Sequence, residues 1–327
     1  MGTGEFYKDV LMPDVAKIFN DMNADYDNLD DVWYSWLYSR LHYFIAKTVI
    51  KHRNPETVLD IGCGTGFQSY LHAAAGSSVV GIDMASDLVA KAAEKQNRFN
   101  YQTVELFPVY FDYVAKYNRI IKKIVTQSRG SRPYTPPKFH VGDATELPFE
   151  EGHFDHVNIC GSVLNFIPQH QKAIAEIARV LKLNGTFFIE IDARWNFDTM
   201  WTVIDPLLRG RFGLNEDLTQ SARLLRTQPL QNVMIDFPFG EKNKPVHMKL
   251  KYFTHHFFKR ILQSYGLQVE KRWSIHSLTN LIPSTLLDTS FPSKKLVKLF
   301  TFLARLEERL PFFLPGSSLV YYGRKIK

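Results

Sequence analysis

Hydrophobic and polar positions along the chain change their spacing several times, and these changes predict alternating helices and strands. Between positions 13 and 53, aromatic and aliphatic residues recur at helical spacing, which predicts a helical N-terminal segment. Two short apolar runs follow, each with a helical pattern after it, and glycines separate the first run from its helix. The runs lie at 57–61 and 78–83, the helical patterns at 67–75 and 88–96, and the glycine turn at 62–66. This order predicts a strand–helix–strand unit with parallel strands.

The alternation continues in the second half of the chain. Five further apolar runs predict strands at 139–143, 154–160, 186–191, 267–275 and 318–323. An amphipathic pattern at 171–183 predicts a helix with Ile174, Ile177 and Leu181 on its apolar face. Asn184 and Gly185 are expected to end that helix. Seven strands alternating with helices indicate an α/β fold with a doubly wound, mostly parallel sheet.

Three long segments interrupt this alternation, at 100–137, 192–258 and 277–316. Loops longer than about 15 residues in a compact domain usually have a function or a structure of their own. The sequence therefore predicts a helical N-terminal lid segment at 1–53 and an α/β domain at 54–327 that carries these three insertions.

The formal net charge of +7 is distributed unevenly along the chain. Residues 101–138 carry a net charge of +5 and residues 292–327 carry +6, whereas residues 1–53 carry −2. A hydrophobic content of 45% is enough for a sizeable core and excludes a mostly disordered chain. The basic excess permits an anionic partner without requiring one.

The two cysteines, Cys63 and Cys160, are too few for a disulfide framework or a four-cysteine zinc site, and we expect both to be small buried thiols. The first residues lack the basic and apolar stretches of a secretory signal, and Phe6 stands where a myristoylation signal has Ser or Thr. No run approaches 18 uninterrupted apolar residues. We therefore expect a cytoplasmic protein that does not cross a membrane.

The glycine turn predicts a ligand site, because backbone N–H groups and the positive end of a helix dipole meet there. Gly62, Gly64 and Gly66 do not have the spacing of a dinucleotide site, whose third glycine would stand where Phe67 does. This difference disfavours a nicotinamide-dependent oxidoreductase. Asp83 ends the second predicted strand, where its carboxylate can accept hydrogen bonds from the hydroxyl groups of a nucleoside.

Five segments resemble, in order, the motifs of the Rossmann-like S-adenosylmethionine-dependent methyltransferases. They are residues 58–66, 80–83, 142–149, 154–160 and 177–188. The closest similarity is to the branch that methylates small molecules and quinones, whose N-terminal segment is also acidic and aromatic. The resemblance covers about half of the chain. It implies a seven-stranded Rossmann-like sheet and S-adenosylmethionine as the cofactor.

Site residues follow from the same resemblance. It implies that Asp60, Gly62 and Gly64 shape the pocket for the methionine part of the cofactor, and that Asp83 holds the ribose hydroxyls. Asp143 would accept a hydrogen bond from the adenine amino group. The full set implied to bind the cofactor is Tyr26, Asp60, Gly62, Cys63, Gly64, Asp83, Met84, Asp143, Ala144 and Cys160.

Two further groups of residues are implied by the resemblance. Gly161 and Ser162, which follow Cys160, would border the reacting sulfur and the substrate. Phe19, Tyr26 and Asp27 resemble the N-terminal lid of that branch, in which an aromatic residue closes over the cofactor. Methyl transfer from a sulfonium depends mainly on positioning and on excluding water, so no catalytic triad is required.

The resemblance implies methyl transfer to a small or lipid-like acceptor, and we expect the insertions at 192–258 and 277–316 to form its pocket. An RNA methyltransferase is the alternative enzyme, with basic residues 116–132 against phosphates. It is disfavoured because residues 160–163 lack the Asn/Asp-Pro-Pro-aromatic motif typical of enzymes that methylate base amines. A cofactor-binding scaffold without catalysis is a third interpretation.

Several histidines are candidates for functional groups. His140, His153, His156 and His170 bracket the expected pocket and could include a general base, although their spacing singles none of them out. His247 and the pair His255-His256 do not predict a metal site, because neighbours in sequence point in different directions on a helix.

Residues 292–316 combine basic and apolar positions and leave two interpretations open. Lys294, Lys295 and Lys298 precede an apolar stretch at 299–304, and residues 311–315 add aromatic bulk. Such a segment can bring a protein to an anionic lipid surface. Alternatively, the helix packs its apolar stripe on the sheet, and Glu307 and Glu308 dilute its basic character.

Overall fold

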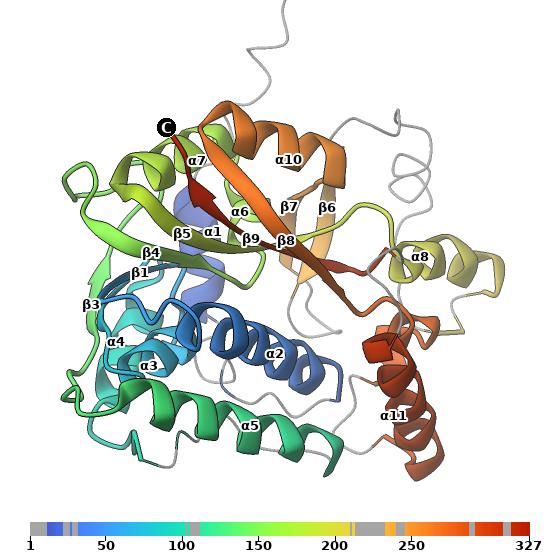
Figure 1. The fold of residues 1–327 in the computed structure, drawn as a ribbon. Coiled ribbons are helices and arrows are strands. Elements are labelled where there is room, and N and C mark those ends of the chain that lie inside the picture. The colour runs from blue at the N-terminus through green and yellow to red at the C-terminus, as the bar shows by residue number, and fades with distance from the viewer. Residues whose placement is uncertain are drawn as a thin grey trace, which may run out of the picture.

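The structure of the chain, a computed structural model, describes residues 12–21, 27, 32–102, 104, 112–209, 211–212, 233–239, 246–287, 292–309 and 315–327. Within these residues, seven strands form one sheet and two further strands form a hairpin. Helices lie on both faces of the sheet, which gives three layers (Figure 1). The predicted α/β class with a seven-stranded Rossmann-like sheet is confirmed.

The strands of the sheet lie in the order β3-β2-β1-β4-β5-β9-β8. They are β1 (Thr57–Ile61), β2 (Ser78–Asp83), β3 (Lys138–Val141), β4 (Phe154–Ile159), β5 (Leu181–Asp192), β8 (Leu267–Ile275) and β9 (Ser318–Lys325). The first five strands, β1 through β5, are all parallel to their neighbours in this group, and β9 is antiparallel to both β5 and β8. The strand order reverses between β1 and β4, and ligand sites of open α/β sheets form at such a reversal.

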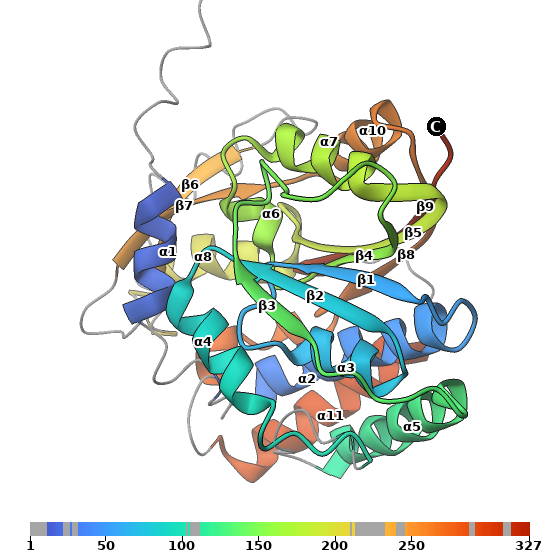
Figure 2. The same cartoon turned by 90° about the vertical axis from the view of Figure 1, so that its left-hand side faces the viewer.

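Helices cover the two faces unequally. One face packs against α2 (Val32–Phe44), the π-helical turn η1 (Ile45–Ile50), α3 (Phe67–Ala74), α5 (Asp112–Arg129) and α11 (Lys294–Arg309). The opposite face packs against α6 (Val163–Phe166), α7 (His170–Val180) and α10 (His255–Ser264). α4 (Ser86–Lys95) packs along β2 and β3, and α1 (Met12–Asp21) lies against α4 (Figure 2).

The remaining elements belong to the second and third insertions. They are α8 (Phe197–Leu207), the hairpin of β6 (Val233–Phe239) and β7 (Val246–Tyr252), and the 3₁₀ turns η2 (Thr279–Leu281) and η3 (Ser284–Leu286). None of the helices in the described ranges combines the length and the apolar character needed to span a membrane.

The core lies on both faces of the sheet. Phe187 and Ile189 of β5 face α7 and α10, whereas Phe188 between them faces the layer of α2 and α5. This division follows from the alternation of side chains along a strand. Trp36 and Leu41 of α2 are fully buried. Trp36 packs against Tyr113 and Tyr117 of α5 and against Phe300 of α11, whereas Phe44 stacks on Trp273 of β8.

Two predicted helices have different boundaries in the structure. The segment at 13–53 is divided into α1, α2 and η1, and residues 22–26 and 28–31 lie outside the described ranges. The helix predicted to end at Leu183 ends at Val180, and Leu181 already pairs with Phe154 in the sheet. The register then shifts, and Asn184 adopts a left-handed φ of 64°. Asn184 and Gly185 therefore mark a bulge inside β5 rather than the end of a helix.

Candidate functional site

A pocket opens at the carboxyl ends of β1, β2 and β4, where the strand order reverses. It encloses about 690 Å³ when the space at its open mouth is counted. It is lined by Val15, Ala16, Phe19, Ile61, Gly62, Ile82, Asp83, Met84, Ala85, Leu88, Gly142, Ala144, Cys160, Gly161, Val163, Phe166 and Ile167. Among these lining residues Asp83 carries the single charge, and the other walls are apolar side chains and backbone.

The turn between β1 and α3 has the backbone geometry that its glycines predict. The φ angle is +66° at Gly62, +51° at Gly64 and +87° at Gly66, a region that other residues rarely adopt. Gly62 is also limited by space, because a Cβ there would stand 2.2 Å from Cγ2 of Val163. The backbone of the pocket wall therefore passes directly against α6.

Asp83 joins the end of β2 to this turn. Its Oδ2 accepts a hydrogen bond from the N–H of Gly64 at 2.8 Å, and its Oδ1 accepts one from the N–H of Ala85 at 2.9 Å. Burial raises the pKa of Asp83, and the backbone N–H groups partly oppose that rise. A carboxylate has about four lone-pair sites, so Asp83 can also accept hydrogen bonds from hydroxyl groups in the pocket.

Asp60 lies beneath the turn rather than in the pocket wall. Its Oδ2 accepts a hydrogen bond from the Ser69 hydroxyl at 2.6 Å, and its Oδ1 accepts one from Nδ2 of Asn158 at 2.8 Å. These bonds connect β1 to α3 and to β4. Burial raises the pKa of Asp60 to about 6. Asp60 thus positions the strands that carry the pocket and does not line it.

Asp143 and Ala144, both predicted to bind the cofactor, take different positions. Ala144 lines the pocket, whereas Asp143 is not among its lining residues. Oδ1 of Asp143 accepts a hydrogen bond from the N–H of Thr145 at 2.7 Å, which closes an Asx-type turn. The N–H of Gly142 donates to the carbonyl of Asp83 at 2.9 Å and so ties this loop to β2.

Cys63 and Cys160 are both free and buried, which confirms the expectation of buried thiols. Cys160 lines the pocket, and Cys63 belongs to the glycine turn, where its N–H donates to the carbonyl of Ile82 at 3.0 Å. Burial raises the pKa of both thiols well above the ordinary value, so both stay protonated at neutral pH.

Glu190 of β5 organises the turn that follows β4, and the sequence analysis did not single it out. Its Oε2 accepts hydrogen bonds from the N–H groups of Gly161 and Ser162 at 2.9 and 2.7 Å. Its Oε1 accepts from the hydroxyls of Ser162 and Ser318. Glu190 is 1% exposed, and burial raises its pKa. A single acidic residue inside the apolar run at 186–191 was the signal that could have identified it.

A second missed residue, Asp192, lies two positions further along β5. Its carboxyl group is hydrogen-bonded to the side chain of Ser162, and its pKa is raised by burial and by the charges of Glu190 and Asp198. Asp198 is itself hydrogen-bonded to Ser284 of the third insertion. Acidic groups therefore gather at the carboxyl end of β5, directly behind Gly161 of the pocket wall.

The N-terminal segment closes one side of the pocket. Phe19 of α1 lines it and lies edge-on against Phe166 of α6, with the ring centres 5.5 Å apart. Asp27 is hydrogen-bonded to the Thr65 hydroxyl and forms an ion pair with Lys95 of α4. Tyr26, the remaining predicted lid residue, lies outside the described ranges.

The histidines considered in the sequence do not line the pocket. His140 and His153 are exposed, and His156 is buried with its Nδ1 2.8 Å from the hydroxyl oxygen of Thr186. His170 lies beside Lys251, and burial lowers its pKa to about 4.

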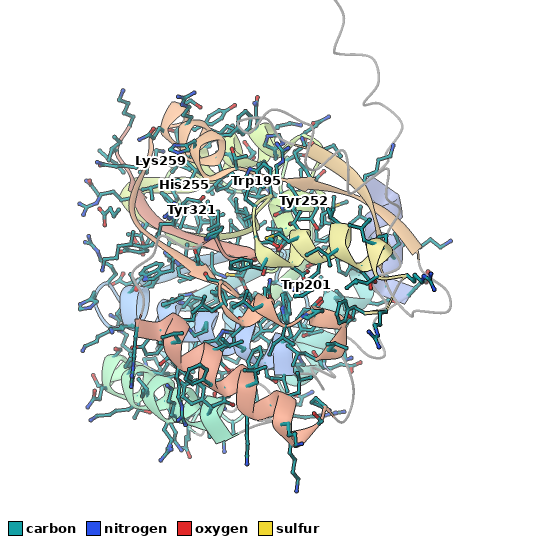
Figure 3. The ribbon with its side chains drawn as sticks, turned by 90° about the vertical axis from the view of Figure 1, so that its right-hand side faces the viewer. Trp195, Trp201, Tyr252, His255, Lys259 and Tyr321 are labelled. Carbon is teal, nitrogen blue, oxygen red and sulfur yellow. The ribbon has the colours of Figure 1, made fainter. Side chains whose placement is uncertain are left out.

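The remaining histidines are placed as follows. His255 lies against Tyr321, with its Nδ1 3.0 Å from the phenol oxygen (Figure 3). The side chain of His247 is outside the described part. Among the side chains that the structure describes, no group of three His, Cys, Asp or Glu residues could hold a metal ion.

The second and third insertions contact each other near the carboxyl end of β5. Trp201 lies on α8 (Figure 3), and its Nε1 donates to the carbonyl of Asn280 at 2.9 Å. The Thr285 hydroxyl donates to the carbonyl of Phe212 at 2.6 Å. α8 begins just after Asp192 and Arg194, so the joined insertions start where the acidic groups gather.

Comparisons with known proteins agree with this geometry. Residues 59–189 match the family model of a methyltransferase domain. A demethylmenaquinone methyltransferase of Oceanobacillus iheyensis is 26% identical over 177 residues, which are 52% of this chain and 58% of that protein. The demethylmenaquinone methyltransferase of Staphylococcus carnosus is 28% identical over 178 residues, or 52% of this chain and 57% of that protein.

The chain thus spans somewhat more than half the length of the curated relatives it matches. Among solved structures, a putative S-adenosylmethionine-dependent methyltransferase from Listeria monocytogenes superposes with a TM-score of 0.50 at 15% identity. The superposition covers 89% of this chain and 99% of that one. At 15% identity, this similarity shows a shared fold and no more.

Proposed function

We propose that this chain, whose residues 59–189 match the model of a methyltransferase domain, transfers a methyl group from S-adenosylmethionine to a small or lipid-like acceptor. The observation that carries the proposal is the pocket at the ends of β1, β2 and β4. There a glycine turn with left-handed backbone meets one carboxylate, Asp83, in apolar surroundings.

The residues present fit this cofactor. Asp83 offers acceptor sites to the ribose hydroxyls, and Gly62 lines the pocket with its backbone. Ala144, Leu88 and Ile82 line the pocket with apolar side chains, which suits a flat base. When bound, S-adenosylmethionine supplies a methyl group on a positively charged sulfur atom.

The chain's own contribution is to position the reactants and to exclude water. Phe19 and Phe166 bring α1 and α6 together over one wall, and Asp27 connects the N-terminal segment to the glycine turn. Glu190 fixes the turn at Gly161 and Ser162, which lies between the pocket and the joined insertions. Positioning of this kind accounts for much of the rate acceleration when an enzyme transfers a group between two bound molecules.

The acceptor approaches from the side of the insertions in this proposal. An oxygen or carbon acceptor must lose a proton when it gains the methyl group, and Asp192 lies behind the turn on that side. Its raised pKa makes its carboxylate a stronger base than an exposed one. The names of the relatives indicate demethylmenaquinone as an acceptor to test first.

Calorimetry with S-adenosylmethionine, S-adenosylhomocysteine and NADH tests the cofactor site. Transfer of label from methyl-labelled cofactor to demethylmenaquinone, and to fractionated metabolite extracts, tests the reaction. Binding of NADH without binding of S-adenosylmethionine would refute the proposal. Tight binding of S-adenosylhomocysteine without transfer to any fraction would instead favour a cofactor-binding scaffold.

A further inference from the structure

Helix α11 has two separate apolar faces. Phe300, Leu303 and Ala304 are buried against the core, as expected for a helix that packs on the fold. A second row, Leu299, Phe302 and Leu306, is 48%, 62% and 39% exposed. Its members are three and four positions apart and therefore form one stripe on the outside of the helix.

Every exposed residue of α11 is either basic or apolar. The set is Lys294, Lys295, Lys298, Leu299, Phe302, Arg305, Leu306 and Arg309. The exposed part of this helix therefore carries five positive charges and no negative one. Lys298, Arg305 and Arg309 recur at helical spacing and lie along one side of the apolar stripe.

The two acidic residues of α11 are turned toward the protein. Glu307 accepts hydrogen bonds from the backbone N–H groups of His276, Leu278 and Thr279, at 3.0 to 3.2 Å. Glu308 forms an ion pair with Lys116 of α5 at 3.0 Å. Neither carboxylate lies on the outer face, so the net charge of that face is more positive than the net charge of the helix sequence.

The two basic segments of the sequence meet at this place. Glu308 joins α11 to Lys116 of α5, and the guanidinium of Arg305 lies over the ring of Tyr113, also on α5, at 5.1 Å. Both helices lie at the same end of the molecule (Figure 1, Figure 2). The described exposed residues of α5 include Arg119, Lys122 and Lys123 and no acidic residue, which extends the positive surface.

We propose that the outer face of α11, with its stripe of Leu299, Phe302 and Leu306 beside Lys294, Lys295 and Lys298, docks the protein on an anionic lipid surface. The apolar stripe enters the boundary between headgroups and acyl chains, while the basic residues contact the headgroups. A nucleic acid would satisfy the charges but not the exposed leucines and phenylalanine, which is why lipid is the better match. A protein docked in this way would meet a lipid-dissolved acceptor directly.

Flotation with vesicles tests this proposal without cofactor or acceptor, so its outcome is independent of methyl transfer. The full chain is mixed with phosphatidylcholine vesicles, with or without phosphatidylglycerol, at low and at high salt. The wild type is expected to float with the anionic vesicles at low salt and to be released from them by salt.

Two variants separate charge from apolar contact. Lys294→Glu, Lys295→Glu and Lys298→Glu together are expected to weaken partitioning by at least about a hundredfold, because each basic residue contributes about fivefold. Leu299→Ser, Phe302→Ser and Leu306→Ser together are expected to abolish flotation while leaving the net charge unchanged. The matched control is Lys172→Glu, Arg260→Glu and Lys327→Glu, which changes the charge equally at exposed positions elsewhere and should retain binding.

Four results would overturn the proposal. They are no flotation of the wild type at low salt, an equal loss of binding in the control, a dimer in sedimentation experiments that the serine variant abolishes, and binding to an RNA oligonucleotide that only the charge variant weakens. The dimer would assign the face to a second copy of this chain, and the RNA result would assign it to nucleic acid. Thermal unfolding of each variant verifies that it is folded.

Discussion

The hydroxyl of Thr65 donates a hydrogen bond of 2.6 Å to Oδ1 of Asp27, which lies 38 positions earlier in the chain. Thr65 belongs to the glycine turn, and Asp27 belongs to the N-terminal segment that closes one side of the pocket. The same carboxylate forms ion pairs with Lys95 and Lys91 of α4, at 2.9 and 3.7 Å. One acidic side chain thus connects the N-terminal segment to two walls of the cofactor pocket.

Asp27→Ala is expected to weaken S-adenosylhomocysteine binding by roughly tenfold, because a charge-assisted hydrogen bond contributes about 1.5–3 kcal/mol and part of that loss is offset by solvation. Calorimetry measures the affinity. Asp21→Ala, which removes an exposed carboxylate at the end of α1, is the matched control and should bind as the wild type does. Equal affinities in all three proteins would show that the connection does not support the pocket.

Asp83→Ala is expected to weaken S-adenosylmethionine binding by more than tenfold, since the carboxylate bonds to the glycine turn and faces the pocket. Binding should also weaken at acidic pH, at values above the ordinary pKa of an aspartate, because burial raises the pKa of Asp83. Glu94→Ala on the exposed side of α4 controls for the loss of one charge. Calorimetry that finds unchanged affinity in Asp83→Ala would remove Asp83 from the site.

Gly62→Ala is expected to abolish cofactor binding, because its Cβ would stand 2.2 Å from Cγ2 of Val163 at a φ of +66°. Val163→Ala removes the clashing methyl groups, so the double variant should regain part of the lost stability. The left-handed backbone would still cost about 1–2 kcal/mol. Thermal unfolding of the two single variants and the double variant measures the coupling. Purely additive losses would contradict the close approach.

Asp192→Asn is expected to lower kcat by about a hundredfold while leaving the cofactor affinity unchanged, if the carboxylate takes the acceptor proton. In the wild type, kcat should rise with pH as Asp192 loses its proton around its raised pKa, and the variant should lack this rise. Asn keeps the shape of the side chain and its hydrogen bond to Ser162. A variant with an unchanged kcat and pH profile would leave the proton transfer to another group.

Asp60 makes the stability of the fold depend on pH. Its pKa is raised from 3.8 to about 6 by burial, so the folded state binds a proton more readily than the unfolded state does. The free energy of unfolding should therefore fall as the pH rises from about 4 to about 6, by a total of about 3 kcal/mol. This contribution is fully present below the unfolded-state pKa and absent above pH 6.

Asp60→Asn isolates this effect. The amide can keep both hydrogen bonds, because its oxygen accepts from Asn158 and the Ser69 hydroxyl can accept instead of donate. Urea unfolding at pH 4 to 7 is expected to show a smaller pH dependence in the variant. Glu56→Gln, an exposed carboxyl just before β1, is the control. Parallel curves for wild type and Asp60→Asn would mean that Asp60 does not titrate in this range.

The sequence predicts the parts of the site that depend on local geometry. Glycine spacing after an apolar run determines the turn, and Asp83 at the end of the next strand follows from the same unit. The sequence does not distinguish a carboxylate that faces a ligand from one that serves the fold. Asp60 was expected to shape the pocket and Asp143 to accept from the adenine amino group; in the structure they accept hydrogen bonds from the Ser69 hydroxyl and from the N–H of Thr145, and neither is among the lining residues.

Long-range contacts account for the residues that were missed. Glu190 is recognisable only when β4 and β5 lie side by side and its carboxylate reaches the N–H groups of Gly161 and Ser162. The two faces of α11 could not be predicted for the same reason. The sequence shows Glu307 and Glu308 among basic residues but not the direction in which their side chains point. Their partners, Thr279 and Lys116, lie far away in the sequence.

β9 lies in the sheet between β5 and β8, although both of these strands precede it in the chain. During synthesis, β5 therefore leaves the ribosome with an unpaired edge that remains open until residues 318–325 have been made. At 5–20 residues per second this interval is on the order of 10 s. The walls of the pocket are complete by Ile167, so a nascent chain can form the pocket while its sheet still has an edge that attracts other strands. Slow translation of the insertions would lengthen the period in which the unfinished sheet is exposed to aggregation.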